Sequence, residues 1–222
     1  MTTVGIIGSG MIGGTVARLS VAAGYHVVVS NSRGPETLAE LAAELGPLAT
    51  PGTAAQAAEA GDLVLVSVPV KAFGELPVKA LAGKPVMDTG NYYPQRDGHL
   101  NELDTGALTS SGLLQRDLPD AQVVKVFNNI YFRHLDSLAR PHGSQDRSAL
   151  PIAGDSAAAK AAVTAFLDAI GYDAVDAGSL ADSWHQEPGT PVYGTPYGPY
   201  TDEAGTVAPA ARIHTDLVGA HR

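Results

Sequence analysis

Six residues near the N-terminus, Gly8-Ser9-Gly10-Met11-Ile12-Gly13, constrain the fold of this chain more than any other segment. They form a Gly-x-Gly-x-x-Gly pattern between a short apolar run and a segment with helical spacing of apolar residues. In that setting Gly8 permits a tight turn, Gly10 lets a pyrophosphate approach the backbone, and Gly13 lets helix and strand pack closely. The free N–H groups at the start of the helix would then bind the pyrophosphate. We therefore predict a dinucleotide-binding turn here.

Apolar runs and helical segments alternate along the chain. We expect strands at residues 4–7, 26–29, 63–68, 85–88 and 122–126, and helices at residues 11–23, 35–45, 53–60 and 110–117. This order predicts an α/β fold, a doubly wound parallel sheet of the Rossmann type with helices on both faces. Residues 91–109 are polar and are expected to be loop-like.

A second part of the chain continues the same alternation. It has an expected strand at residues 150–153, a helix at 156–170 and a strand at 173–176. We predict a core of residues 1–145 and an extension of residues 146–222 that packs on the same sheet.

Residues 189–200 differ in composition from the rest of the chain. They contain Gly-Thr-Pro twice, together with Tyr193, Tyr197 and Tyr200. The prolines and glycines exclude a regular helix or a central strand. The segment is either an ordered loop or a tether to a last helix at residues 208–218, and its tyrosines favour the ordered loop.

The end of the second strand indicates which dinucleotide is bound. An NAD enzyme usually has a carboxylate there for the ribose 2′-hydroxyl, but this chain has Asn31, Ser32 and Arg33. Amide and hydroxyl groups can donate hydrogen bonds, and a guanidinium pairs well with phosphate. This set predicts NADP(H). No Asp or Glu precedes Glu36, which suits a bound polyanion, although buried strands also exclude carboxylates.

Other polar or rigid residues follow neighbouring strands. Ser67, Val68 and Pro69 end the third strand, and Asn91 and Asn128 follow the next two. Because ligands of such sheets bind beyond the carboxyl ends of the strands, these residues are further candidates for cofactor binding. Pro69 would form a wall for the nicotinamide, and the two amides suit ribose or carboxamide groups. Capping of a loop is the alternative role for either Asn.

Hydride transfer needs proximity and orientation more than a strong acid or base. If a proton donor is required, the candidates are Tyr92, His134, His185 and Tyr193, each of which could instead be a surface or packing residue. Tyr92, Trp184 and Tyr193 are candidates for contacting the second substrate. The seven histidines show no metal-binding pattern and the chain has no cysteine, so we predict no metal.

Charge and hydropathy exclude several classes of partner. The chain has 14 Lys and Arg against 23 Asp and Glu, a net charge of −9, which argues against general nucleic-acid binding. No apolar stretch is long enough to span a bilayer, and the first residues lack the basic start of a signal peptide. We therefore expect a cytoplasmic location and no membrane partner.

Five motifs together resemble a known family. They are Gly8 to Gly13, Asn31 to Arg33, Leu65 to Pro69, Lys125 to Asn129 and Ile152 to Asp155. In this order the chain resembles NADPH:deazaflavin (coenzyme F-420) oxidoreductases and related short NADP-binding reductases, over about residues 3–184. The segment after Trp184 departs from the pattern of that family.

The resemblance implies hydride exchange between NADP(H) and a deazaflavin stacked against the nicotinamide, often in a homodimer. By position, it implies phosphate contacts for Ser9, Met11, Ile12, Ser32 and Arg33, and nicotinamide contacts for Val68 and Pro69.

Three functions remain open. The first is exchange of a hydride between NADPH and a deazaflavin, and the second is NADPH-dependent reduction of a small carbonyl or imine. The third is an NADP(H)-binding sensor without catalysis, which would be favoured if residues 91–93 and 184–200 left no cavity above the nicotinamide.

Overall fold

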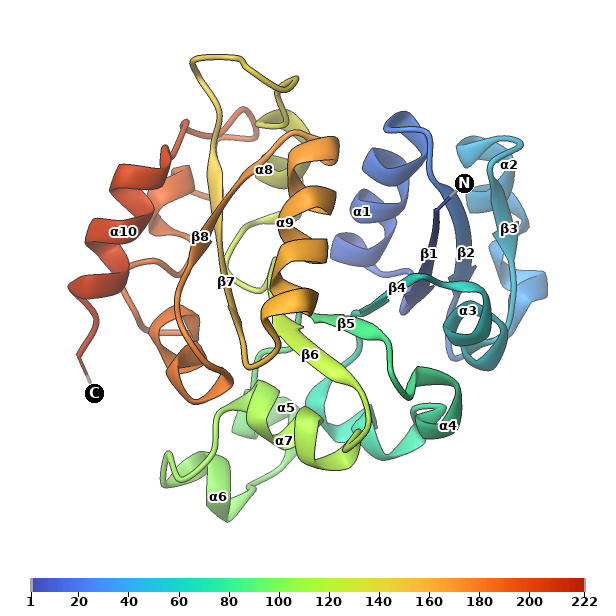
Figure 1. Cartoon of the computed structure of the whole chain (residues 1–222), viewed down its shortest axis with the longest axis horizontal. Helices are drawn as coiled ribbons and strands as arrows, with labels where there is room; N and C mark the ends of the chain where they lie inside the picture. Colours follow the sequence, from blue (N-terminus) through green and yellow to red (C-terminus); the bar gives the residue numbers. More distant parts are fainter. Residues whose placement is uncertain (1, 222) are drawn as a thin grey trace.

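The computed structural model describes residues 2–221, which form one eight-stranded sheet covered by helices (Figure 1). The order of strands across the sheet is β3-β2-β1-β4-β5-β6-β7-β8. The strands are β1 Thr3–Ile7, β2 His26–Ser30, β3 Ala49–Pro51, β4 Leu63–Val66, β5 Pro85–Asp88, β6 Gln122–Lys125, β7 Ala149–Gly154 and β8 Asp173–Asp176. Strands β1 to β6 pair in parallel, so the predicted Rossmann-type α/β fold is confirmed.

The sheet is mixed, which corrects the expectation of a wholly parallel one. Strand β7 is antiparallel to β6, with Val124 opposite Gly154 and Lys125 opposite Ala153. The connection holds only a short helix, α8 (Phe132–Ser137), which packs against α1 (Met11–Ala22). Since the chain does not cross back to the amino end of the sheet, β7 starts at the edge where β6 ends.

The longer helices lie where the sequence predicts them, within two residues at each end, except that the second of them begins four residues later than predicted. They are α1, α2 Ala39–Leu45, α3 Ala54–Ala60, α7 Ser110–Asp117, α9 Ala157–Ile170 and α10 Ala210–Val218. The expected helix at residues 35–45 begins with a 3-10 turn, η1 Pro35–Leu38. The loop-like stretch holds two single-turn helices, α5 Pro94–Asp97 and α6 Asn101–Asp104. The remaining short elements are η2 Val70–Glu75, α4 Val78–Leu81, η3 Leu180–Gln186 and η4 Thr195–Tyr197.

Both faces of the sheet are buried. Leu63 and Leu65 of β4 belong to the core that α1 and α9 cover, at the front of Figure 1, whereas Val64 and Val66 belong to the core covered by α3, α4 and α7. Successive side chains of a strand point to opposite faces, which explains why this strand is apolar throughout.

The extension continues the same sheet through β7 and β8, and the division at residue 145 stays a prediction. The segment of residues 189–200 is an ordered loop, as its tyrosines suggest. Val192 and Tyr197 are fully buried, and the Tyr197 hydroxyl donates a hydrogen bond of 2.9 Å to the Ala149 carbonyl. Within residues 2–221, no helix combines the length and hydropathy needed to span a membrane.

Candidate active site

The glycine turn between β1 and α1 has the geometry expected of a pyrophosphate site. A Cβ at Gly8, where φ is +100°, would lie 2.2 Å from the Ser67 carbonyl oxygen, and one at Gly13 would lie 1.9 Å from the Gly8 carbonyl oxygen. At Gly10, a Cβ would meet nothing within 4 Å. The first turn of α1 has no acidic residue. The start of this helix is therefore open to an anion.

The turn after β2 presents a guanidinium without a partner. The Asn31 carboxamide oxygen accepts from the Arg33 N–H at 2.9 Å, and its Nδ2 donates to the Thr37 hydroxyl at 2.9 Å. The Arg33 side chain is exposed and has no hydrogen bond or ion pair within residues 2–221. Glu36 folds over Gly34, where a Cβ would lie 2.4 Å from its carboxylate. Arg33 is thus free to pair with a phosphate.

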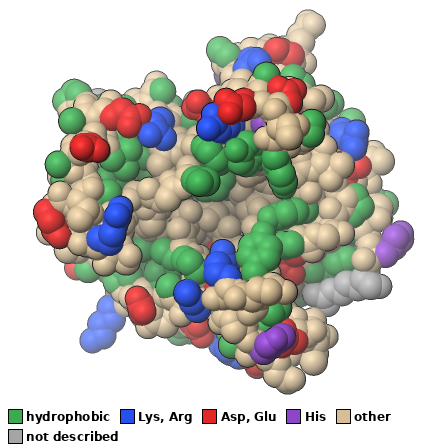
Figure 2. Space-filling view, turned by 180° about the vertical axis from the view of Figure 1, so that it is seen from behind, with side chains coloured by type: hydrophobic (Ala, Val, Ile, Leu, Met, Phe, Trp, Pro, Cys, Tyr) green, Lys and Arg blue, Asp and Glu red, His purple; other side chains and the backbone are tan. Residues whose placement is uncertain are grey.

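A cavity of about 580 Å³ opens at the carboxyl ends of β4, β5 and β6. Figure 2 shows the face behind helices α1 and α9, which is hollowed at its centre and has hydrophobic side chains gathered around the hollow. The cavity is lined by Met11, Ile12, Ser67, Val68, Pro69, Thr89, Gly90, Asn91, Tyr93, Arg96, Phe127, Asn128, Asn129, Ile130, Tyr131, Phe132, Tyr193 and Tyr200. Seven of the predicted cofactor residues are in this set, from Met11 to Asn128.

The wall of this cavity is mainly apolar and aromatic. Arg96 is the single charged residue among those that line it. Its guanidinium stacks on the Tyr93 ring at 5.0 Å and forms an ion pair of 2.8 Å with Asp97. Because the charge of Arg96 is balanced locally, the cavity suits a flat ring system better than a strongly charged molecule.

The turn after β6 has an unusual backbone. Phe127 has φ of +64°, alone among the described non-glycine residues in the left-handed region. Its buried ring packs edge-on against Phe166, with centroids 6.5 Å apart. Backbone strain of this kind concentrates at functional sites. Here it directs Asn128 and Asn129 towards the cavity.

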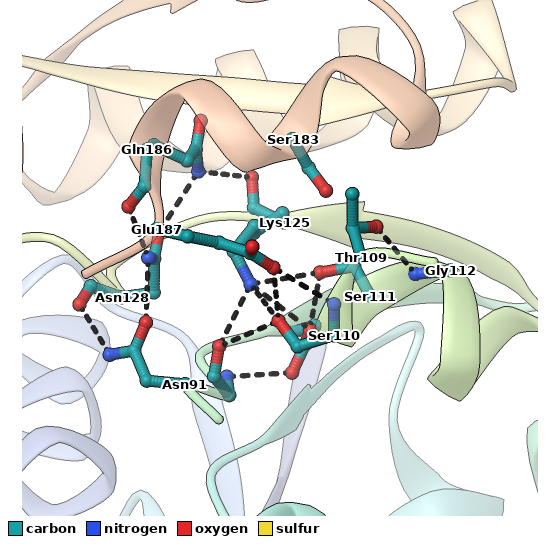
Figure 3. Close-up of polar contacts among 12 residues, drawn as sticks. Asn91, Thr109, Ser110, Ser111, Gly112, Lys125, Asn128, Ser183, Gln186 and Glu187 are labelled. Carbon is teal, nitrogen blue, oxygen red and sulfur yellow. Dashed lines mark hydrogen bonds and ion pairs between the residues drawn. The ribbon is translucent and has the colours of Figure 1, made fainter. Parts of the chain in front are cut away.

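The two predicted cofactor amides bind each other (Figure 3). Asn128 Nδ2 donates to Asn91 Oδ1 at 2.9 Å and to the Gln186 carbonyl at 2.7 Å, while Asn91 Nδ2 donates to the Asn128 carbonyl at 2.8 Å. Both residues line the cavity, but these polar groups already have partners. Their role in the described structure is to join the turns after β5 and β6 to helix η3.

A buried lysine lies behind this wall. Lys125 and Asp88 are fully buried, 3.8 Å apart. The Lys125 ammonium donates to the Gly90 carbonyl at 2.8 Å. It also donates to the hydroxyls of Ser110 at 2.8 Å and Ser111 at 3.1 Å, towards which it points in Figure 3. It does not line the cavity, so it fixes the turn at Gly90 rather than reaching a ligand.

Two tyrosines meet in the cavity wall. The hydroxyls of Tyr93 and Tyr193 are 2.5 Å apart, and Asn91 Nδ2 donates to the Tyr193 hydroxyl at 3.4 Å. Burial raises the pKa of Tyr193 well above its ordinary value, with a contribution from the hydrogen bond to Tyr93. Tyr193 is therefore a neutral phenol across the physiological range.

The other candidate donors and substrate residues lie elsewhere. The Tyr92 hydroxyl donates to Asp104 at 2.7 Å, and the Tyr92 ring packs on the core that α3, α4 and α7 cover. His134 is buried behind Tyr131, with Nε2 2.6 Å from the Asp202 carbonyl oxygen. Trp184 and His185 stack on each other at 3.8 Å, outside the cavity lining. Of the five residues predicted as proton donors or substrate contacts, only Tyr193 lines the cavity.

Several cavity residues are absent from the predicted set. They include Tyr93, Arg96, Asn129, Tyr131, Phe132 and Tyr200. Tyr93 and Asn129 adjoin predicted residues, and their place after a strand is the signal that could have identified them. Arg96 carries no such signal because a single-turn helix positions it. Within residues 2–221, no group of three His, Cys, Asp or Glu residues could hold a metal.

Fold and site together define a Rossmann-type dinucleotide-binding protein. Residues 3–92 match the family described as "NADP oxidoreductase coenzyme F420-dependent". This segment contains the glycine turn, the Asn31–Arg33 turn and the Ser67–Pro69 turn. The match confirms the resemblance over residues 3–92, the part of the chain that carries these three turns.

Solved structures extend the similarity over most of the chain. A hypothetical protein, SMa0349 of Sinorhizobium meliloti, is 29% identical with a TM-score of 0.75, over 86% of this chain and 93% of that one. A "putative f420 dependent nadp-reductase" from Arthrobacter sp. FB24 is 25% identical with a TM-score of 0.68, over 82% and 87%. An imine reductase from Pseudomonas sp. shares the fold at 18% identity, with a TM-score of 0.58, over 82% and 57%.

One curated relative matches a shorter segment. YjhV of Escherichia coli (strain K12) is 43% identical over 53 residues, which are 24% of this chain. The match spans 39% of the length of that protein.

Proposed function

We propose that the protein transfers a hydride between NADPH and a deazaflavin coenzyme, coenzyme F420. The observation that carries this proposal is the cavity of about 580 Å³ at the carboxyl edge of the sheet, with aromatic walls and little charge. Such a cavity leaves room for a second flat ring beside the nicotinamide. The family match of residues 3–92 supports the choice of both partners.

The described residues fit NADP(H). The open space at Gly10 and the acid-free first turn of α1 would hold the pyrophosphate, and the unpartnered Arg33 would hold the 2′-phosphate. Val68 and Pro69 would flank the nicotinamide from the end of β4. When bound, the dinucleotide supplies or accepts the hydride, and the chain provides binding, orientation and exclusion of water.

The aromatic side of the cavity fits the deazaflavin. Tyr93, Tyr131, Phe132, Tyr193 and Tyr200 contribute aromatic side chains to the lining of the cavity. Aromatic rings pair favourably in offset or edge-on arrangements, so a tricyclic ring system would be held by stacking rather than by charge.

A second function is supported by the phenol pair. Reduction of a small carbonyl or imine needs a proton together with the hydride, and the cavity contains the paired hydroxyls of Tyr93 and Tyr193. The imine reductase from Pseudomonas sp. shares the fold. The third hypothesis, a sensor without catalysis, is disfavoured because Asn91, Tyr93, Tyr193 and Tyr200 border a cavity rather than fill it.

The test is a direct assay of acceptors. Purified protein is mixed with NADPH and oxidised deazaflavin, and the absorbance of both chromophores is followed. Loss of both at the same rate supports the proposal. Tight NADPH binding without turnover of deazaflavin rules it out, and a panel of cyclic imines and small aldehydes then tests the second function.

A homodimer is a further proposal, and sedimentation of the purified chain tests it.

A further inference from the structure

The loop of residues 189–200 is not explained by the cofactor site. It lies outside the segment that matches the family model, yet it brings the hydroxyl of Tyr193 to the cavity wall, 2.5 Å from the hydroxyl of Tyr93. The two residues are 100 positions apart in the sequence. Both side chains are only partly buried, so a molecule in the cavity can reach them.

Asn129 holds this loop on both sides of Tyr193. Its Nδ2 donates to the Val192 carbonyl at 3.0 Å, and its own carbonyl accepts from the Gly194 N–H at 2.8 Å. Asn129 is 1% exposed. At Gly194 φ is +74°, a backbone conformation that favours glycine. The position of Tyr193 is therefore fixed by buried backbone contacts.

The hydrogen bonds around Tyr193 give its hydroxyl a direction. Its oxygen accepts from Asn91 Nδ2, which is held in turn by Asn128. When Tyr93 donates to the same oxygen, the hydrogen of Tyr193 is left to point at a molecule in the cavity. The partner phenol is itself only partly buried, so it can exchange protons with solvent and return one to Tyr193.

We propose that Tyr193 is the proton donor of the reaction and that Tyr93 resupplies it. This rests on the proposed function and specifies the acceptor as a neutral C=N or C=O system, conjugated or not, that takes a proton with the hydride. The hydride forms a new C–H bond at the acceptor, and the π electrons move to its nitrogen or oxygen. The O–H bond of Tyr193 breaks as that atom is protonated. Tyr93 then gives its proton to the phenolate and regains one from water.

The experiment compares three single substitutions, each of which removes one hydroxyl. Tyr193→Phe and Tyr93→Phe remove the proposed donor and its relay. Tyr25→Phe is the matched control, because Tyr25 packs on Phe166 in another part of the molecule and does not line the cavity. NADPH affinity, kcat with oxidised deazaflavin and with a cyclic imine, and the solvent deuterium isotope effect on hydride transfer are measured for each.

We expect Tyr193→Phe to lower kcat by about 100-fold, within the range for loss of a general acid. Tyr93→Phe should lower it less, and Tyr25→Phe should not change it. NADPH affinity should stay within a factor of two of the wild-type value in all three variants. The solvent deuterium isotope effect on hydride transfer should differ between Tyr193→Phe and the wild type.

Three results would overturn the donor role. A kcat of Tyr193→Phe close to that of the wild type contradicts it and leaves the proposed function intact. Loss of NADPH binding together with kcat assigns Tyr193 a structural role instead. A wild-type protein that reduces neither acceptor overturns the proposed function, and the donor role with it.

Discussion

Gly10 and Gly13 differ in what a side chain would meet, although both belong to one motif. A Cβ at Gly10 has open space around it, whereas one at Gly13 would lie 1.9 Å from a backbone oxygen. We expect Gly10→Ala to fold with nearly wild-type stability and to bind NADPH about tenfold more weakly, a loss of about 1.4 kcal/mol. We expect Gly13→Ala to lose about 1–3 kcal/mol of stability through overpacking. Urea unfolding and NADPH titration of both variants test this pair, and equal stabilities would contradict it.

Arg33 offers a test of cofactor choice at the same scale. Its exposed guanidinium has no partner among residues 2–221, so replacing it should leave the fold unchanged. A hydrogen-bonded charge contributes about 1.5–3 kcal/mol, and we expect Arg33→Ala to weaken NADPH by about 10- to 100-fold. NADH lacks the 2′-phosphate, so the same substitution should weaken the binding of NADH by less than about twofold. Similar losses for both dinucleotides would show that Arg33 does not bind this phosphate.

At the scale of elements, a buried ion pair joins the ends of the paired strands β5 and β6. Lys125 and Asp88 are both fully buried, and Lys125 also binds the Gly90 carbonyl. Lys125→Met leaves a buried carboxylate without its cation, which typically costs about 3–5 kcal/mol. Adding Asp88→Asn removes that charge, so the double variant should be more stable than Lys125→Met. Urea denaturation of both variants measures the difference, and a double variant less stable than the single one would refute the account.

The positions of the helices and strands were largely predictable from the sequence, whereas the way in which β7 pairs with β6 was not. Periodicity located β1, β5, α7 and β8 within a residue because each is a local pattern. The antiparallel entry of β7 depends on the path of residues 126–148, which no local pattern encodes. The three-residue edge strand β3 was missed because Pro51 disguises it, although an edge tolerates proline.

The candidate site shows the same limit. The glycine turn was predictable because each of its residues has a backbone requirement that holds in any such fold. Neighbours in sequence could not be told apart: Tyr92 packs into a core, while Tyr93 faces the cavity. Contact between Tyr93 and Tyr193 spans 100 residues and requires the whole fold to form. Residues at the site that act through long-range contacts therefore emerged only from the structure.

Over the whole molecule, hydrogen-bonded carboxylates link stability to pH. A hydrogen bond with His142 lowers the pKa of Asp168, and the charge of Arg147 lowers it further. A hydrogen bond with Ser179 lowers the pKa of Asp182, and one with Tyr92 lowers the pKa of Asp104. The folded chain thus binds fewer protons than the unfolded chain in the acid range. Stability from these groups is present above their unfolded pKa, about 3.9 for Asp, and is lost as pH falls through the lower folded values.

We therefore expect the urea midpoint to be steady from about pH 7 to pH 5 and to fall steeply below about pH 4. Asp168→Asn isolates one contribution, because this carboxylate accepts from His142 at 2.8 Å and from Arg147 at 2.9 Å. Asp168 is 45% exposed, so solvent screens the pair, and the variant should lose only about 0.5 kcal/mol at pH 7. Its deficit should shrink as pH falls from about 4 towards about 2, since the wild-type carboxyl becomes protonated as well. A deficit that stays constant down to that pH would mean that Asp168 stabilises the fold through packing rather than through its charge.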